Sequence, residues 1–484
     1  MLDSSVAAVV DTLAGKTLDH EARVHCALPG ALGGCSLRDG YEGYMHAAYW
    51  ATWIAHKNDV RMVAERLGRP LLSDPDALEA GEAAAHLLSE GICTQGETLA
   101  FTRQAAELYA SGPWVRDRPL ERVFAYTGEL EALAVGASAS HPPALIPVDE
   151  LVDILEEGVE GSPGVALSTA RPVEIGQRRR ILGRLMRGLD ALRATKLYQG
   201  MSCDRRVGLL SSAGEGAGSF WTTVPTHVTQ RFTSAEWSVA FQGKLGLLKA
   251  PRGTTCQLPS GRDPTEVCGV TMDEPCRHPS QCGAGPNTLR THNALSEVVR
   301  QLAVREGAFA DKEQRVPDLY HVDPTSGAVV EAILDVVISW PGSGIVHRVD
   351  VTVRCPYAAR YAATSHSRSA VAADKGDEDK RVRYGDEVMP LTFESLGRLS
   401  AEGHATLAAI SRESILYGKK RIGRRPGVQV KTLRARLEVE LLRQQADTLL
   451  VSLGSRSLAA LGWLPDTVFA AGLIGVSGVR AAAA

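Results

Sequence analysis

Three aspartates near the middle of the chain lie in or beside short apolar runs. Asp318 follows Pro317, Asp335 lies in Ala-Ile-Leu-Asp-Val-Val-Ile, and Asp350 lies in Val-Asp-Val-Thr-Val. Runs of β-branched and aliphatic residues bounded by Gly, Pro and Ser are typical of buried strands. A buried carboxylate is unfavourable unless a metal ion, a cation or backbone amides offset its lost hydration. Three such acids on adjacent strands therefore predict a divalent cation site.

A second group of reactive side chains lies just before these aspartates. Zinc takes four sulfur or nitrogen ligands in a tetrahedron, usually supplied as close pairs by short loops. His278 and Cys282 form one such pair, and the more widely spaced Cys256 and Cys268 are expected to complete the set. Cys276 is a competing ligand for the second pair. The odd total of nine cysteines and the lack of a signal peptide favour a reducing compartment and metal binding over disulfides.

The composition is that of a globular protein. The 484 residues are 44% hydrophobic and 23% charged, with a formal net charge of -3, which suits two or three domains with sizeable cores. The basic run at 178–206 suits either a solvated helix face, the commoner case, or contact with a phosphate backbone. A second basic run at 419–425 on the other side of the acidic segment adds support for nucleic-acid contact. No apolar run approaches the roughly 18 residues of a membrane span, so no membrane contact is expected.

The elements that must position these groups change in type along the chain. Residues 1–240 and 401–484 are predicted to be mostly helical, and 250–293 form the Cys/His loop. Between them, residues 294–400 predict an α/β core, with elements in the order helix 292–307, strands 315–320, 331–340 and 345–354, helix 374–384 and strand 387–393. The glycine-rich stretch 211–226 lacks Gly-Lys-Ser/Thr, so it predicts a turn rather than a phosphate loop.

This order, αβββαβ, is that of the restriction-endonuclease core. That core carries a Glu on its first helix, an Asp on one strand, and an Asp or Glu with a nearby Lys on the next. Here Asp335 and Asp350 would share a metal ion, and Glu297 would reach it from the helix. Thr352 stands where the strand lysine is expected, so Lys380, with Lys375 as second choice, would supply the ammonium from helix 374–384.

The segment resembles the C-terminal part of polyproteins from site-specific non-LTR retrotransposons, which carry a restriction-like PD-(D/E)XK endonuclease after their reverse transcriptase. The motifs that carry the resemblance are Cys268-Gly269, His278-x-x-x-Cys282, Thr291-His292-Asn293 after Arg290, Arg315-x-Pro317-Asp318, Val349-Asp350-Val351-Thr352 and Lys380-x-x-Arg383-Tyr384. The likeness covers most of the chain, most densely from 205 to 400. No polymerase palm motif is present, so the chain resembles a fragment or a derived product without reverse transcription.

The resemblance implies a DNA endonuclease that depends on Mg²⁺ or Mn²⁺ and nicks a target strand. It further implies Zn²⁺ in the Cys/His loop, DNA and possibly element RNA as partners, and, for a functional endonuclease, a nuclear location. The spacing leaves two pairings open, Asp318 or Asp335 with Asp350. The residues implied to contact nucleic acid are His292, Asn293, Arg315, Arg383 and Tyr384. One alternative is an inactive nucleic-acid-binding relic of the same element, and another treats the acids as hydrogen-bonded structural residues.

Overall fold

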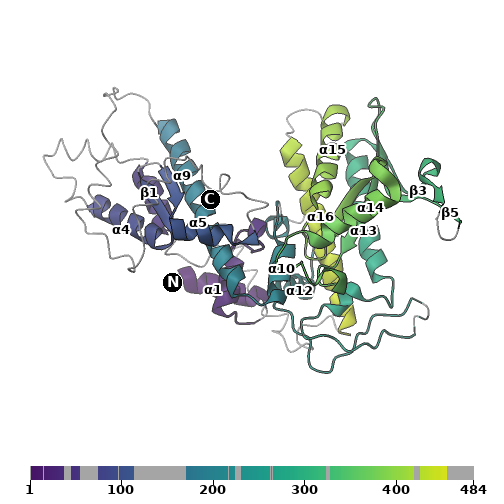
Figure 1. The fold of residues 1–484 in the computed structure, drawn as a ribbon, viewed down its shortest axis with the longest axis horizontal. Coiled ribbons are helices and arrows are strands. Elements are labelled where there is room, and N and C mark those ends of the chain that lie inside the picture. Colours follow the sequence, from purple (N-terminus) through teal and green to yellow (C-terminus); the bar gives the residue numbers. More distant parts are fainter. Residues whose placement is uncertain are drawn as a thin grey trace. The chain divides into compact units, whose positions relative to one another are not determined.

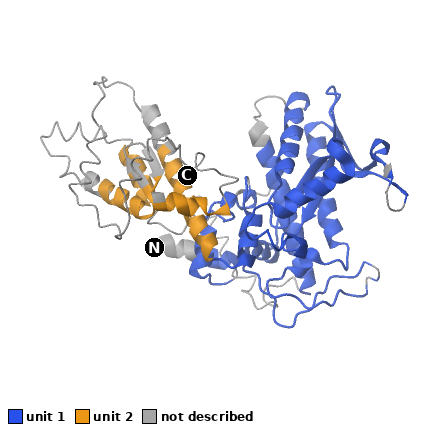
Figure 2. Ribbon diagram, viewed as in Figure 1, with its two compact units in different colours: residues 1–37, 201–484 blue, residues 38–200 orange. Residues whose placement is uncertain are grey.

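The computed structural model divides the chain into two compact units. It describes residues 2–14, 16–36, 45–54, 75–95, 98–113, 171–215, 217–223, 231–261, 263, 265–322, 327–418 and 426–454. The larger unit comprises residues 1–37 and 201–484, and the smaller one residues 38–200 (Figures 1 and 2). The predicted boundary near residue 240 therefore falls inside the larger unit. The basic run at 419–425 lies outside the described residues, as do the side chains of residues 178–180.

The described part of the smaller unit is helical apart from one hairpin. Besides a helix over residues 45–54, its elements are α4 (Pro75–Ser89), β1 (Ile92–Gln95), β2 (Thr98–Phe101), α5 (Arg103–Ala110) and α9 (Arg171–Gly200). The two strands pair antiparallel, with Ile92 opposite Phe101. The Thr102 side chain caps α5 by accepting a hydrogen bond from the amide of Ala105. The sequence predicted the helices but not this hairpin.

A four-stranded mixed sheet organises the larger unit. Its strands, in spatial order, are β3 (Phe309–Arg315), β6 (Ile333–Ser339), β7 (Val346–Arg354) and β8 (Met389–Glu394). β6 runs antiparallel to both β3 and β7, whereas β8 runs parallel to β7. A parallel neighbour requires a crossover connection, and α14 (Val371–Tyr384) lies in that connection. The predicted mixed α/β class is confirmed, and the strands of this sheet follow α13 (Asn287–Glu306) as three strands, α14 and a fourth strand, apart from a small hairpin inserted between β3 and β6.

Helices pack on both faces of this sheet. α13 (Asn287–Glu306), α15 (Ala401–Tyr417) and α16 (Pro426–Ser452) share one apolar core with the sheet residues Val349, Val351, Leu391 and Phe393. α13 contributes the helically spaced Leu295, Val299 and Leu302, and it ends at Gly307, whose φ of 103° suits glycine. Because side chains alternate along a strand, Asp350 and Thr392 point to the opposite face, against which α14 packs.

The first strand of the sheet lies earlier than predicted. β3 ends at Arg315, and Pro317–Leu319 form a 3-10 turn, η7, in place of the strand expected at 315–320. Proline has no amide hydrogen to donate to a ladder, which explains why the pairing stops before it. A small antiparallel hairpin then separates β3 from β6. Its strands, β4 (His321–Val322) and β5 (Val329–Val330), are two residues long each.

The remaining described α-helices of the larger unit are α1 (Leu2–Ala14), α2 (His20–Ala27), α10 (Cys203–Ser212), α11 (Ser219–Thr222) and α12 (Ser234–Lys244). A buried ion pair joins them to α16. Lys244 Nζ lies 2.8 Å from Glu438 Oε1, and both side chains are 0% exposed. The Glu438 carboxylate also accepts hydrogen bonds from the amides of Gly218 (2.9 Å) and Phe220 (3.3 Å). This carboxylate thus binds amides at the start of α11, and the described residues just before α11 in the glycine-rich stretch form a bend and turns.

Removing one charge of this pair should destabilise the larger unit strongly. Glu438→Gln leaves the Lys244 ammonium buried without its counter-charge, so the free energy of unfolding should fall by about 3–5 kcal/mol. Adding Lys244→Met to this variant should recover part of the loss, because the orphaned charge disappears. Urea denaturation measures both.

The matched control is the ion pair between Lys249 and Glu274, whose side chains are each 72% exposed. Glu274→Gln should change the free energy of unfolding by less than about 1 kcal/mol, because water screens exposed pairs. Equal effects at Glu274 and Glu438 would contradict a structural role for the buried pair.

Candidate active site and metal centre

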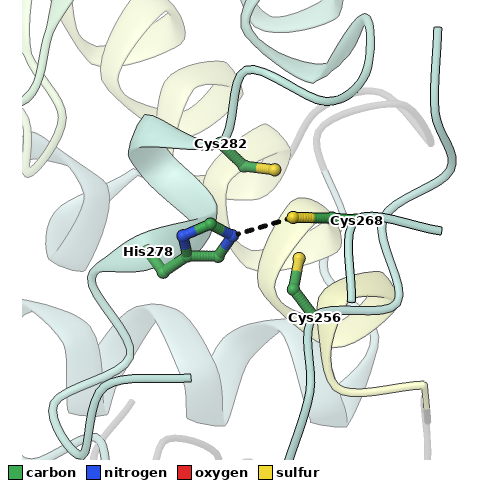
Figure 3. Close-up of side chains that lie close together, drawn as sticks. All are labelled: Cys256, Cys268, His278 and Cys282. Carbon is green, nitrogen blue, oxygen red and sulfur yellow. Dashed lines mark hydrogen bonds between the residues drawn. The ribbon is translucent and has the colours of Figure 1, made fainter. Parts of the chain in front are cut away.

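Four predicted zinc ligands come together in the larger unit. The ligand atoms of Cys256, Cys268, His278 and Cys282 all lie within 4.8 Å of one another, as Figure 3 shows. Cys268 Sγ lies 3.3 Å from His278 Nε2. Three thiols and one imidazole nitrogen at such separations form a donor set that suits tetrahedral zinc. The grouping is confirmed, and it could hold a metal ion such as zinc.

A short antiparallel ladder closes the wide spacing between Cys256 and Cys268. The amide of Cys256 donates to Val270 O (2.8 Å), and the amide of Cys268 donates to Leu258 O (2.9 Å). Gly269, with a φ of 69°, lies within this ladder and donates to Cys256 O (2.9 Å). Backbone pairing across the ladder therefore replaces the closer sequence spacing that is common for zinc ligands.

The second pair of ligands flanks a 3-10 turn, η6 (His278–Gln281). Asp273 fixes this turn, because its carboxylate accepts from the amides of Arg277 (2.9 Å) and His278 (2.8 Å). Cys276 lies outside the ligand group, and its buried thiol contacts Glu274 O instead (3.8 Å). The structure thus places Cys256, not the competing Cys276, with the other ligands.

Asp335 and Asp350 meet on adjacent strands. Val336 of β6 pairs with Val349 of β7, which brings the two aspartates next to each other at the following position. Their carboxyl groups interact directly. Asp350 is buried, and the Asp335 side chain is 14% exposed. Of the two pairings that the sequence left open, the structure places Asp335, not Asp318, beside Asp350.

Three donors surround these two carboxylates. Lys380 Nζ, from α14, lies 2.8 Å from Asp350 Oδ1. His292 Nε2, from α13, lies 2.8 Å from Asp335 Oδ1. The amide of Val351 donates to Asp335 Oδ2 at 2.6 Å. Each carboxylate thus has a cationic or titratable partner of its own.

The two carboxyl groups differ in their protonation. Burial, followed by the charge of Asp335, raises the pKa of Asp350 to about 7, even though Lys380 acts in the opposite direction. Burial also acts to raise the pKa of Asp335, but the hydrogen bond and charge of His292, together with the contacts to Asp350 and the Val351 amide, hold that pKa below its usual value. Two interacting buried carboxyl groups titrate as a unit. Such a pair is typical of functional sites and of sites that a divalent cation would stabilise.

The position of α14 brings Lys380 to Asp350. An added Cβ at Gly376 would lie 2.6 Å from Thr392 Cγ2 of β8, so the close approach of helix and strand requires glycine at this position. α14 follows Ala370, which has a φ of 60° and no side-chain acceptor to cap the helix. Glu394 at the end of β8 accepts from the amides of Ala372 (3.1 Å) and Ala373 (3.4 Å) in its place.

Two predicted catalytic residues lie away from this group. Asp318 is in η7, with its side chain 63% exposed, and it pairs with Arg348 (2.7 Å). Because η7 lies beyond the end of β3, Asp318 has no place in the sheet ladder. Glu297 of α13 pairs with Arg300 (2.6 Å) and Lys312 (3.7 Å) rather than with the aspartates. The prediction that Asp318 and Glu297 join the carboxylate pair is therefore corrected.

The five residues predicted to contact nucleic acid fall into different settings. His292 contacts Asp335 directly, and the Asn293 carbonyl accepts from Lys312 (3.4 Å). Arg315 is exposed and pairs with Glu331 (3.2 Å). The guanidinium of Arg383 stacks over the ring of Tyr384, 4.8 Å from its centroid. Tyr384 itself is buried in an apolar cluster with Leu334 and Val388, which leaves its ring little surface for stacking on a base.

Sequence reasoning missed Glu394 and Glu438. Glu394 ends the apolar run Leu391-Thr392-Phe393, the same signal that singled out the aspartates, and it was detectable on that ground. Glu438 lies in a helix rich in charged residues, where nothing in the local pattern distinguishes it from a solvated side chain. Only its contact with Lys244 reveals its role.

Loss of one metal ligand should release zinc and loosen the surrounding core. Cys256 and Cys282 belong to an apolar cluster with Phe220 and with Leu442 and Leu449 of α16. Without a bound metal ion, the packing of this cluster should loosen. Cys282→Ser should reduce zinc content from about one ion per chain to near zero and should lower the melting temperature. Atomic absorption and calorimetry measure these effects. Cys276→Ser is the control and should retain zinc; loss of zinc there would contradict the assignment.

Neutralising Asp350 should stabilise the protein in buffer without added divalent cations. Because its folded-state pKa of about 7 exceeds the ordinary 3.8, the folded protein holds a proton that the unfolded chain releases. The stability contributed by this proton is complete below about pH 4 and is lost as the pH rises to about 7. Asparagine resembles the protonated form at every pH. Asp350→Asn should therefore melt above the wild type at pH 8 and close to it only below about pH 4.

Calorimetry at the two pH values tests this expectation. Asp318→Asn is the control, because the Arg348 guanidinium lowers the pKa of that exposed carboxyl and the variant should gain no stability at pH 8. If Asp350→Asn melts at or below the wild-type temperature at pH 8, the charge of Asp350 does not destabilise the folded protein and the expectation is wrong.

Comparisons with protein-family models, with curated proteins and with solved structures found no match. Within the part of the chain that the structure describes, no helix is both long and apolar enough to cross a membrane. What the chain does is therefore inferred from its own side chains.

Proposed function

We propose that this chain is a divalent-metal-dependent endonuclease of the restriction-like class that nicks DNA. The contact between Lys380 and Asp350 carries the proposal, because it joins an ammonium to a carboxylate that already lies beside Asp335. Metal-assisted phosphodiester hydrolysis uses carboxylates to hold the metal ion and is helped by a cation near the attacking water. Asp335, Asp350 and Lys380 supply these groups.

The fold gives the proposal further support. The order helix, three strands, helix, strand is that of the restriction-endonuclease core, with the carboxylates on its second and third strands. Lys380 reaches Asp350 from the following helix, while Thr352 occupies the strand position where that core carries its lysine. A lysine contributed by a helix places its ammonium beside the same carboxylate.

Each residue of the group has a defined task under this proposal. Asp335 and Asp350 would hold Mg²⁺ or Mn²⁺, which would lower the pKa of a bound water and offset charge on the phosphate. Lys380 orients the attacking water or contacts the scissile phosphate. His292 binds Asp335 Oδ1 and fixes the direction of that carboxylate, as partners of metal ligands generally do.

The motif series points to the same class of protein. The Cys/His group, followed by the His292-Asn293 pair and the acidic strands, resembles the end of a non-LTR retrotransposon polyprotein, and we infer an origin in such an element. DNA, and possibly element RNA, would be its partners, and a DNA target would place the protein in the nucleus. The zinc-binding group would serve to hold nucleic acid beside the carboxylates.

A nicking assay tests the proposal. Zinc-loaded protein with Mg²⁺ or Mn²⁺ should convert supercoiled plasmid to the open circle. Asp350→Asn, Asp335→Asn and Lys380→Gln should each lower the rate by about 10²–10³-fold, because each removes a group that acts on the transition state. His292→Ala should lower it by about 10–100-fold, since it removes a partner of a metal ligand.

Two matched variants serve as controls. Lys375→Gln removes the other candidate lysine, which pairs with Glu378 (2.8 Å), and should nick at the wild-type rate. Asp318→Asn should do the same, since Asp318 lies apart from the carboxylate pair. Wild-type protein that binds plasmid without nicking it under any of these conditions would overturn the proposal in favour of an inactive nucleic-acid-binding relic.

A further inference from the structure

Glu394 is a fully buried acid that the proposed chemistry does not use directly. It is the last residue of β8 and pairs in register with Arg354 of β7. Its side chain is on the same face of the sheet as Asp350, because Asp350, Thr352 and Arg354 alternate with the apolar core residues of β7. It thus lies on the face against which α14 packs.

The helix α14 begins without a capping side chain of its own. Ala370, in the left-handed region, precedes the first helical residue, and an alanine cannot accept the orphan amides of a helix N-terminus. Glu394 Oε1 accepts two of them, from Ala372 and Ala373. These amides also act to lower the pKa of Glu394, although burial dominates and raises it.

The turn after β8 is itself held by a neighbouring helix. The amide of Glu394 donates to Arg398 O (2.7 Å), and the amide of Arg398 donates to Ser211 O (2.9 Å) at the end of α10. The buried Arg398 guanidinium donates from Nη1 to Leu210 O and Ala213 O, both at 3.2 Å. The backbone at Glu394 is therefore held in place by α10 through Arg398. The Glu394 carboxylate in turn holds the first turn of α14.

We propose that Glu394 is a positioning residue that sets the place of Lys380 in the active site. Because α14 is a rigid helix, fixing its first turn also fixes the position of Lys380. The Lys380 ammonium must reach Asp350 on the same face of the sheet. Gly376 allows α14 to lie close to β7 and β8. Without the contacts to Glu394, the helix could shift along these two strands. The catalytic meaning of this role rests on the proposed function, whereas the anchoring itself does not.

Two variants at this position separate anchoring from charge. Glu394→Gln keeps an oxygen that accepts the two amides, whereas Glu394→Leu keeps the bulk and removes the acceptor. Hydrogen exchange should be about five- to tenfold faster over the first turn of α14 in Glu394→Leu, because the amides of Ala372 and Ala373 lose their acceptor. Acetylation of Lys380 should also be faster relative to Lys375, as followed by mass spectrometry. Glu394→Gln should stay close to the wild type in both measurements.

The nicking assay then shows whether the anchored position matters for chemistry. Glu394→Leu should lower the single-turnover nicking rate by about 10-fold or more with little change in the Kd for DNA, and Glu394→Gln should restore the rate. Glu378→Gln, a change at an exposed side chain of the same helix, is the control and should behave as the wild type.

The outcomes distinguish the two proposals. Unchanged exchange and unchanged Lys380 acetylation in folded Glu394→Leu would overturn the positioning role, whether or not the protein nicks DNA. Altered exchange and acetylation in a protein whose wild type never nicks would support the anchoring and overturn only the proposed function. If Glu394→Leu fails to fold, Glu394→Ser, with its shorter acceptor, takes its place in the same comparison.

Discussion

The buried pair of Lys244 and Glu438 links the parts of the larger unit. Glu438 lies on α16, Lys244 ends α12, and the same carboxylate binds two amides of the glycine-rich stretch. A buried pair adds little net stability over a well-packed apolar one, but either charge alone would be strongly unfavourable. The pair therefore selects one placement of α16, the placement in which both charges and the two amides are satisfied.

The placement of α16 matters because this helix belongs to two cores. Leu433, Leu437 and Leu441 pack with the sheet, and Leu442 and Leu449 pack around Cys256 and Cys282. The backbone of the helix also reaches the Cys/His loop, where the amide of Gln257 donates to Ser452 O (2.8 Å). A metal ion in that loop would thus stabilise the same helix that supports the acidic strands.

The acidic group itself opposes stability. Burial and mutual repulsion keep a proton on Asp350 near neutral pH, despite an ammonium 2.8 Å away. A structural role would be served better by an amide or an apolar residue at this position. Retention of two such acids side by side is typical of sites where stability is given up for binding or catalysis. The group also lies apart from the cavity between α12, α16 and the Cys/His loop, which none of its residues line.

The sequence alone determined the features that depend on residue type and on the local spacing of apolar residues. Acids within apolar runs predicted the buried strands of Asp335 and Asp350, and the mixture of cysteines and a histidine predicted the metal group. It also predicted that Lys380, in place of a strand lysine, would come from a helix. Tertiary structure decided what depends on contacts between distant segments. Backbone pairing between the segments of Cys256 and Cys268 places Cys256, and not Cys276, among the metal ligands. Because β3 ends before Pro317, Asp318 lies outside the sheet. Glu438 and Glu394 gained their roles from partners far away in the chain, and no local pattern encodes such a partner.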